Sequence, residues 1–228
     1  MTIICAFPTC PTDWASVALV FVPILGAFWG LASDRIAARW PEHEDGLVRR
    51  IGWRTPVVVA FGAAAGWLFA PQVAALPIPT AALFAVVLLA VTLMFATDLD
   101  QRLLPDLLTY PLVPVALLAF VTGIDPFVRT TEDLGWAALA AVAVPGVLWL
   151  LSIPFGKGAI GRGDLKLLFG FGLLVGPGRL FLGLVAGAIL AAVVILVLVV
   201  ARRITLRTYV PYGPFLIAGA VWALLAPG

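Results

Sequence analysis

The sequence predicts an all-α protein, a polytopic membrane helix bundle. Of its 228 residues, 63% are hydrophobic and only 11% are charged, and the mean hydropathy is +1.12. A soluble protein of this size needs far less apolar surface. Several uncharged windows reach the roughly 20 residues with which a helix crosses about 30 Å of hydrocarbon. These runs are continuous rather than alternating, which excludes a transmembrane barrel.

We expect eight transmembrane helices. In chain order they cover residues 14–33, 55–70, 80–97, 107–123, 135–155, 164–178, 180–201 and 210–226. The uncharged stretch 55–97 is long enough for two spans, and Pro71, Pro77 and Pro79 predict the turn that divides it. The uncharged run 167–178 is short for a full crossing, which places Asp164 within or at the edge of the apolar layer.

The basic residues predict the orientation of the bundle. With eight spans, the connections after spans 1, 3, 5 and 7 share one side of the membrane. That side carries Arg35, Arg39, Arg49, Arg50, Arg54, Arg102, Lys157, Arg162, Lys166, Arg202, Arg203 and Arg207, against Arg129 and Arg179 on the other. The positive-inside rule makes the basic side cytoplasmic, so both termini lie outside. The net charge of +2 is therefore a topology signal, and we expect no nucleic-acid partner.

The N-terminal segment and the cysteines give few functional indications. The first thirteen residues lack a basic region, so we expect no cleaved signal peptide and a retained first span. Cys5 and Cys10 lie in this outer segment, where an oxidising compartment could join them, and their pairing stays open. His43 is the single histidine and has no cysteine nearby, so the sequence predicts no metal site.

Two aspartates at the ends of separate spans are the strongest indication of function. Asp98 ends the third span, and Asp164 begins the sixth within Gly161-Arg162-Gly163-Asp164. A carboxylate near hydrocarbon costs several kcal/mol unless it is neutral, paired or hydrated. Both fall on the predicted cytoplasmic side, so they can meet as a dyad. One ionised carboxylate that activates water and one protonated carboxyl that polarises a carbonyl suit peptide-bond hydrolysis, and which aspartate is the base stays open.

Each of the two aspartates also has a purely structural interpretation. Asp164 could cap the start of a helix, and Asp98 could pair with Arg102 one turn later. The glycines at positions 161 and 163 could let a substrate backbone approach Asp164 closely because they lack a β-carbon, with Gly163 the more sensitive to substitution.

Three motifs resemble the type IV prepilin peptidases, which are integral-membrane aspartic proteases of the Gly-x-Gly-Asp type. Asp98 stands seven residues before Pro105-Asp106, Asp164 is followed by Leu165-Lys166-Leu167-Leu168, and Pro211-Tyr212-Gly213-Pro214 is similar to the segment that opens the family's last span. The resemblance is strong over residues 80–228, the expected catalytic core, and weak over residues 1–79. We expect residues 1–228 to form a single peptidase domain.

The resemblance implies an aspartic endopeptidase of the inner (cytoplasmic) membrane that removes the leader of type IV prepilins or pseudopilins at the cytoplasmic face. It makes Asp98 and Asp164 the catalytic residues. Gly161, Gly163, Pro105, Pro211, Gly213 and Pro214 become supporting residues. Asp100 and Asp106 are candidates to bind the positively charged leader, with solvation of a loop as an equal alternative. Lys166 could tune the dyad, but we favour a role in topology.

The chain also departs from larger family members, which carry two Cys-x-x-Cys pairs that bind zinc in the loop after the first span. The corresponding loop, residues 41–54, has no cysteine, so we expect no zinc. Bifunctional members methylate the new N-terminus with S-adenosylmethionine. No Gly-rich nucleotide fingerprint is present, so methylation stays open and no other cofactor is expected.

Two other functions fit paired carboxylates in a membrane. One is a proton- or cation-coupled transporter in which Asp98 and Asp164 form a relay, although no internal repeat supports it. The other is a non-catalytic subunit of a pilus or secretion assembly. Membrane lipids surround the chain in every case, while its oligomeric state and its particular prepilin stay open.

Overall fold

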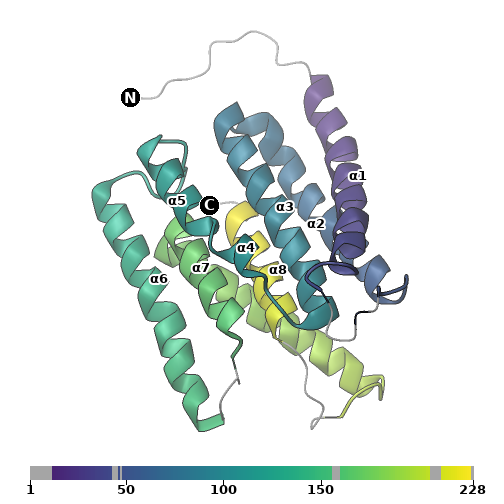
Figure 1. The fold of residues 1–228 in the computed structure, drawn as a ribbon. Coiled ribbons are helices and arrows are strands. Elements are labelled where there is room, and N and C mark those ends of the chain that lie inside the picture. The colour runs from purple at the N-terminus through teal and green to yellow at the C-terminus, as the bar shows by residue number, and fades with distance from the viewer. Residues whose placement is uncertain (1–11, 43–45, 47, 156–159, 206–211, 227–228) are drawn as a thin grey trace.

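The computed structural model describes residues 12–42, 46, 48–155, 160–205 and 212–226, and across these ranges the chain is helical and contains no strand. The helices are α1 (Thr12–Ala37), α2 (Arg54–Ala75), α3 (Ile78–Gln101), α4 (Asp106–Thr109), α5 (Leu112–Val121), α6 (Thr131–Ser152), the 3-10 helix η1 (Ile153–Phe155), α7 (Arg162–Val200) and α8 (Gly213–Leu225), as Figure 1 shows. Within the described ranges, α1, α2, α3, α6 and α7 are long and apolar enough to span a membrane, and Asp106–Val121 and α8 are shorter apolar segments. These findings confirm the all-α membrane class.

The turn between α2 and α3 is shorter than the prolines predict. Pro71 lies inside α2, which continues to Ala75, so its expected place in the turn is wrong. Membrane helices tolerate an internal proline because neighbouring groups satisfy the freed carbonyl. The chain turns at Leu76 instead, whose extended backbone (φ −88°, ψ 150°) is the conformation favoured before a proline such as Pro77.

The segment 107–123 is two helices rather than one. α4 covers only Asp106–Thr109, and α5 starts after Pro111. A proline lacks the N–H that a continuous helix needs, so the helix breaks at Pro111.

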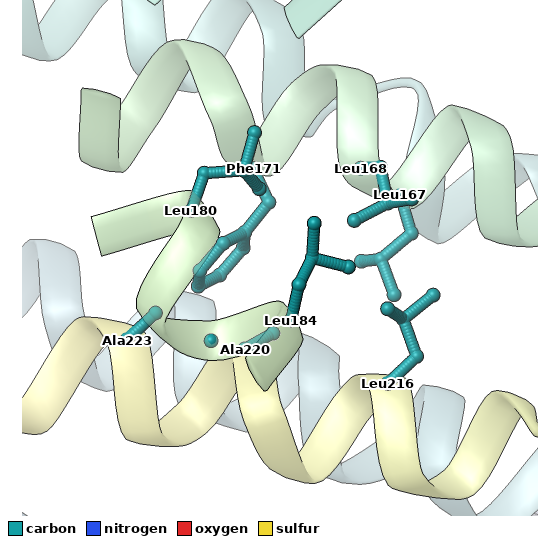
Figure 2. Close-up of a pocket in the computed structure, with 9 residues that line it drawn as sticks. Leu167, Leu168, Phe171, Leu180, Leu184, Leu216, Ala220 and Ala223 are labelled. Carbon is teal, nitrogen blue, oxygen red and sulfur yellow. The ribbon is translucent and has the colours of Figure 1, made fainter. Parts of the chain in front are cut away.

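The long helix α7 folds back on itself at Gly176. Gly176 has φ 73° and ψ 175°, a combination that is essentially restricted to glycine. Leu167 before this residue and Leu184 after it line the same apolar pocket against α8 (Figure 2). In a straight helix they would lie about 25 Å apart at 1.5 Å per residue. The expected division between residues 178 and 180 therefore lies two residues earlier, while the number of membrane crossings stays a prediction.

Glycines spaced four residues apart let α1 and α2 approach closely. A β-carbon on Gly30 would lie 2.6 Å from the Val58 carbonyl oxygen, and one on Gly66 would lie 2.6 Å from that of Val22. Gly26 and Gly62 face each other's backbone in the same way. This is the close helix contact that small residues allow within membranes, where apolar side chains gain little from contacting each other rather than lipid.

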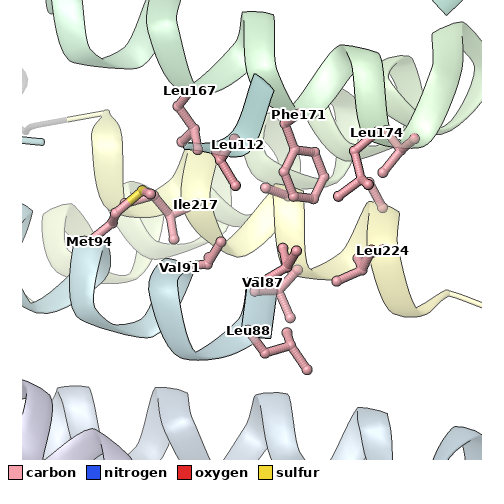
Figure 3. Packing of buried hydrophobic residues seen from close by; sticks show 14 of the residues in the cluster. Val87, Leu88, Val91, Met94, Leu112, Leu167, Phe171, Leu174, Ile217 and Leu224 are labelled. Carbon is pink, nitrogen blue, oxygen red and sulfur yellow. The ribbon is translucent and has the colours of Figure 1, made fainter. Parts of the chain in front are cut away.

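A large part of the buried core lies between α3, α7 and α8 (Figure 3). Its fully buried side chains include Val87, Val91 and Met94 of α3, Leu167, Phe171 and Leu174 of α7, and Ile217 and Leu224 of α8. The C-terminal end of α3 and the N-terminal ends of α7 and α8 lie toward the lower end of the bundle in Figure 1. The core therefore ends where Asp98 and Asp164 are found.

Candidate active site

Asp98 lies in the last turn of α3 and is buried, with 5% of its surface exposed. The helix ends three residues later, and Arg102 adopts a left-handed conformation (φ 55°) while its N–H donates to the Asp98 carbonyl at 2.9 Å. The carboxylate oxygen Oδ2 is fully buried and has no hydrogen-bond partner among the described residues. A buried carboxylate oxygen without a partner is costly, which sets this residue apart from an ordinary charge at the membrane surface.

Asp164 is the third residue of α7 and is half-buried. Its carboxylate accepts a hydrogen bond from the backbone N–H of Gly161, which precedes the helix. Gly161 holds the N-cap position of α7 and no side chain caps it, so the interpretation of Asp164 as the cap residue is wrong. The hydrogen bond to Gly161 does not exclude a chemical role for Asp164, because it helps to fix the direction in which the carboxylate points.

Both aspartates line one cavity of about 530 Å³, which we call the dyad cavity. Its walls are the end of α3 with the turn that follows, α4, and the start of α7, so residues 66 positions apart in the sequence meet here. Arg102, Arg162 and Lys166 also line it. The cavity thus combines two carboxylates with a basic rim and has room for water and a peptide segment.

The first residue of α8 touches Asp98. A β-carbon on Gly213 would lie 2.8 Å from Cγ and 2.9 Å from Oδ1 of Asp98. Pro214, the next residue, is buried in the first turn of α8, where its missing N–H costs nothing. Pro211 lies outside the described residues.

The two glycines before Asp164 face protein atoms. A β-carbon on Gly163 would lie 2.7 Å from Cβ of Leu104, and one on Gly161 would lie 3.0 Å from Oδ2 of Asp164. The space beside Gly163 is thus filled by Leu104, where we expected an approaching substrate backbone. Leu104 was not predicted as a site residue, and its only sequence signal is its place before Pro105, which is itself buried ahead of α4.

Asp106 and Lys166 form an ion pair across the mouth of the cavity. Nζ of Lys166 lies 2.6 Å from Oδ1 of Asp106 and 4.6 Å from the centre of the Tyr110 ring. The lysine therefore directs its charge to α4 rather than to the aspartates.

Asp100 is not among the residues that line the dyad cavity. Its side chain is buried in the last turn of α3 and forms an ion pair with Arg54 at the start of α2, with Nε of Arg49 at 4.0 Å from Oδ1. Only Asp106 of the two candidates for leader binding therefore faces the cavity. Among the described residues, no three potential ligands gather as a metal site, and Cys5, Cys10 and His43 lie outside those residues.

Comparisons with known proteins agree with the motifs. Residues 83–196 match the type IV leader peptidase family. The chain is 34% identical to the prepilin leader peptidase/N-methyltransferase of Aeromonas hydrophila over 217 residues, which cover 91% of this chain and 67% of that protein. The corresponding protein of Pseudomonas aeruginosa is 28% identical over 96% of this chain and 70% of its own length. No solved structure matches the chain.

Fold and cavity together define a multi-pass membrane protein with paired acidic residues at its helix ends. The comparisons specify it further. The chain belongs to the type IV leader peptidase family, and it is an aspartic peptidase of that family.

Proposed function

We propose that this peptidase removes the leader of a type IV prepilin or pseudopilin at the cytoplasmic membrane face, with Asp98 and Asp164 as its catalytic dyad. One observation carries the proposal: carboxylates from α3 and α7 line the same cavity at the end of the helix core. Acidic residues at such a depth are costly and are retained mainly for chemistry or transport. Membership of the type IV leader peptidase family favours catalysis over transport.

The dyad divides the work of hydrolysis between its two members. One carboxylate takes a proton from a water molecule in the cavity while the water attacks the scissile carbonyl. The other donates a hydrogen bond to the carbonyl oxygen and later gives its proton to the leaving amine. Two carboxyl groups that share one proton meet both needs at neutral pH, and they titrate as a pair.

The direction of the site is part of the proposal. Arg102, Arg162 and Lys166 line the dyad cavity. Arg54 pairs with Asp100 at the same end of α3, and Arg35 lies beside Thr55, the residue after Arg54. The positive-inside rule favours the cytoplasm for this basic end. A prepilin whose apolar helix enters from the membrane would present its leader junction at this depth. We propose a single catalytic domain for residues 1–228 and leave N-methylation outside the proposal.

The test is cleavage of a type IV prepilin co-expressed with the full chain, followed by the intact mass of the pilin. We expect the unsubstituted enzyme to remove the leader, and Asp98→Asn or Asp164→Asn to leave prepilin uncleaved at equal membrane levels. Single removal of either member of a catalytic unit typically costs several orders of magnitude in rate. The same mass records methylation as the addition of one methyl group.

Asp125→Asn serves as the matched control, because Asp125 is another buried aspartate that lies after α5, away from the dyad cavity. It should cleave as the unsubstituted enzyme does. Cleavage that survives Asp98→Asn or Asp164→Asn would exclude the dyad. Prepilins that stay intact with the unsubstituted enzyme, across several candidate substrates, would contradict the substrate class.

A further inference from the structure

Asp98, Asp164 and Gly213 come from three different helices and lie one helical turn beyond the buried core. Met94 of α3, Leu167 of α7 and Ile217 of α8 pack together in the buried core (Figure 3). Residues three or four positions apart share a helix face. The residues one turn further toward the cavity on these faces are Asp98, Asp164 and Gly213. The first residue of α8 therefore belongs to the same layer as the two aspartates.

Gly213 occupies this layer without a side chain, and Asp98 fills the space that a side chain would take. A β-carbon at this position would lie 2.8 Å from Cγ and 2.9 Å from Oδ1 of Asp98, and closer still to Oδ2. Ordinary β-carbons do not approach other atoms this closely. The carboxylate and α8 are in direct contact only because residue 213 is glycine.

Contact is important here because, within the described ranges, no hydrogen bond holds Oδ2 of Asp98. This oxygen is buried and has no hydrogen-bond partner among the described residues. Asp164 differs, since it accepts a hydrogen bond from the Gly161 N–H. Two carboxyl groups that must act on one water and one carbonyl have to be held within a fraction of an ångström. For Asp98, the surface of α8 provides this constraint.

We infer that Gly213 is a positioning residue, whose missing side chain lets the start of α8 hold the Asp98 carboxylate in its catalytic orientation. The inference rests on the proposed function, since it takes Asp98 as catalytic. It adds α8 to the site as a third element beside α3 and α7. α8 packs along both of these helices (Figure 3), so its first turn has a fixed place from which to hold the carboxylate.

The residue before Gly213 lies near the second aspartate. Burial raises the pKa of the Tyr212 phenol, and the negative charge of Asp164 raises it further. A charge acts on a neighbour in this way only at short range. The start of α8 therefore has Gly213 in contact with Asp98 and Tyr212 within electrostatic range of Asp164.

The group that a new side chain at position 213 would contact predicts the effect of a substitution there. In Gly213→Ala, the new methyl group meets a side chain, which can rotate away at little cost in stability. The carboxylate then leaves its place while the helices stay where they are. A misplacement of about 1 Å at a reacting group can cost about 100-fold in rate. We expect kcat to fall about 100-fold, KM to stay within about twofold, and the melting temperature to change little.

The experiment uses the full chain, purified in detergent and assayed with an intact prepilin, in four variants. Gly213→Ala tests the inference, and Asp98→Asn gives the rate without the carboxylate. Gly219→Ala is the control for packing, because its β-carbon would meet the backbone of Gly183 on α7. Gly146→Ala is the neutral control, because nothing lies within 4 Å of its β-carbon.

Each outcome separates positioning from packing. Positioning predicts that Gly213→Ala loses kcat and shifts the pH profile of kcat without a loss of melting temperature, while Gly219→Ala loses melting temperature but keeps kcat per folded molecule. The inference is overturned if Gly213→Ala keeps wild-type kcat, or if Gly219→Ala loses kcat per folded molecule to the same extent. If Asp98→Asn itself retains full activity, the proposed dyad fails instead, which is a distinct result.

Discussion

Lys166 and Asp106 form an ion pair of 2.6 Å between Nζ and Oδ1 at the mouth of the dyad cavity. The pair joins α7, two residues after Asp164, to the start of α4. It neutralises the one acidic residue, apart from the dyad, that lines this cavity within the described part of the chain. A cationic leader that approaches the cavity therefore meets a carboxylate that already has a partner.

Removing the lysine should improve the binding of a basic leader. In Lys166→Met the Asp106 carboxylate becomes available to the substrate. Exposed ion pairs are worth up to about 1 kcal/mol, so KM should fall about two- to fivefold while kcat changes little. Steady-state cleavage of a prepilin with a basic leader measures both constants.

The double variant Lys166→Met/Asp106→Asn is the control for this effect, since it lacks the carboxylate that Lys166→Met releases. Its KM should return to the level of Asp106→Asn alone. A fall in KM that persists in the double variant would show that Lys166 itself repels the substrate.

The ion pair between Arg54 and Asp100 should contribute to stability rather than to leader binding. Asp100 is buried, so Arg54→Met leaves a buried carboxylate without this cation. Breaking a buried pair from one side costs about 3–5 kcal/mol. We expect a clear fall in the melting temperature in detergent, with KM unchanged per folded molecule. The charge-exchanged variant Arg54→Asp/Asp100→Arg should recover part of the loss, and a raised KM in Asp100→Asn at full stability would instead assign leader binding to this residue.

Asp125 should make stability depend on pH. Its Oδ1 accepts N–H donors from Phe127 at 2.8 Å and Val128 at 3.1 Å, yet burial is the larger effect and raises the pKa of this carboxyl. The folded state then binds a proton more tightly than the unfolded state, whose pKa is about 3.9. The stabilising contribution is complete below about pH 4 and is lost as the pH rises through the folded-state pKa.

The difference between two melting curves isolates this residue. The melting temperature of Asp125→Asn minus that of the unsubstituted protein should increase between about pH 4 and pH 7. A difference that stays constant, or that falls with rising pH, would contradict the raised pKa.

The glycine contact between α1 and α2 should be sensitive to a single methyl group. In Gly62→Ala the new β-carbon would lie 3.1 Å from the carbonyl carbon of Gly26 and 3.2 Å from Cα of Gly30. Backbone cannot rotate away, so the helices must separate, at a cost of about 1–3 kcal/mol. Thermal unfolding of Gly62→Ala against Gly135→Ala, whose β-carbon would meet nothing within 4 Å, measures the effect. Equal melting temperatures would contradict the close contact.

The helices themselves were predictable because uncharged runs of sufficient length have one stable form in lipid. The residues at which the helices begin and end were harder to predict. Pro71 was expected in a turn but lies within α2, because membrane helices accept proline where a neighbour satisfies the backbone. The spacing of Gly26/Gly30 and Gly62/Gly66 is itself a helix-contact motif, so the close approach of α1 and α2 is a feature that the sequence does encode.

Within the site, the sequence placed the two aspartates at helix ends but not the groups around them. Asp100 and Asp106 look equivalent in sequence, yet one is buried against Arg54 and the other faces the cavity. The rotation of each helix about its axis decides whether such an aspartate faces the core or the cavity, and this rotation is set by packing against the other helices. The contact of Gly213 with Asp98 spans 115 positions, and no local pattern encodes such a distance.

The turn at Gly176 limits how deep the helix that carries Asp164 can reach. From Arg162 to this turn, the first arm of α7 is about 21 Å long at 1.5 Å per residue, which is shorter than the roughly 30 Å of a bilayer's hydrocarbon. A short arm is accommodated by local thinning of the bilayer around it. Lipids with short acyl chains match the arm at little cost, whereas long chains draw it away from the aqueous surface. For the dyad proposed above, we therefore expect the thickness of the surrounding membrane to affect how readily water reaches the two carboxylates.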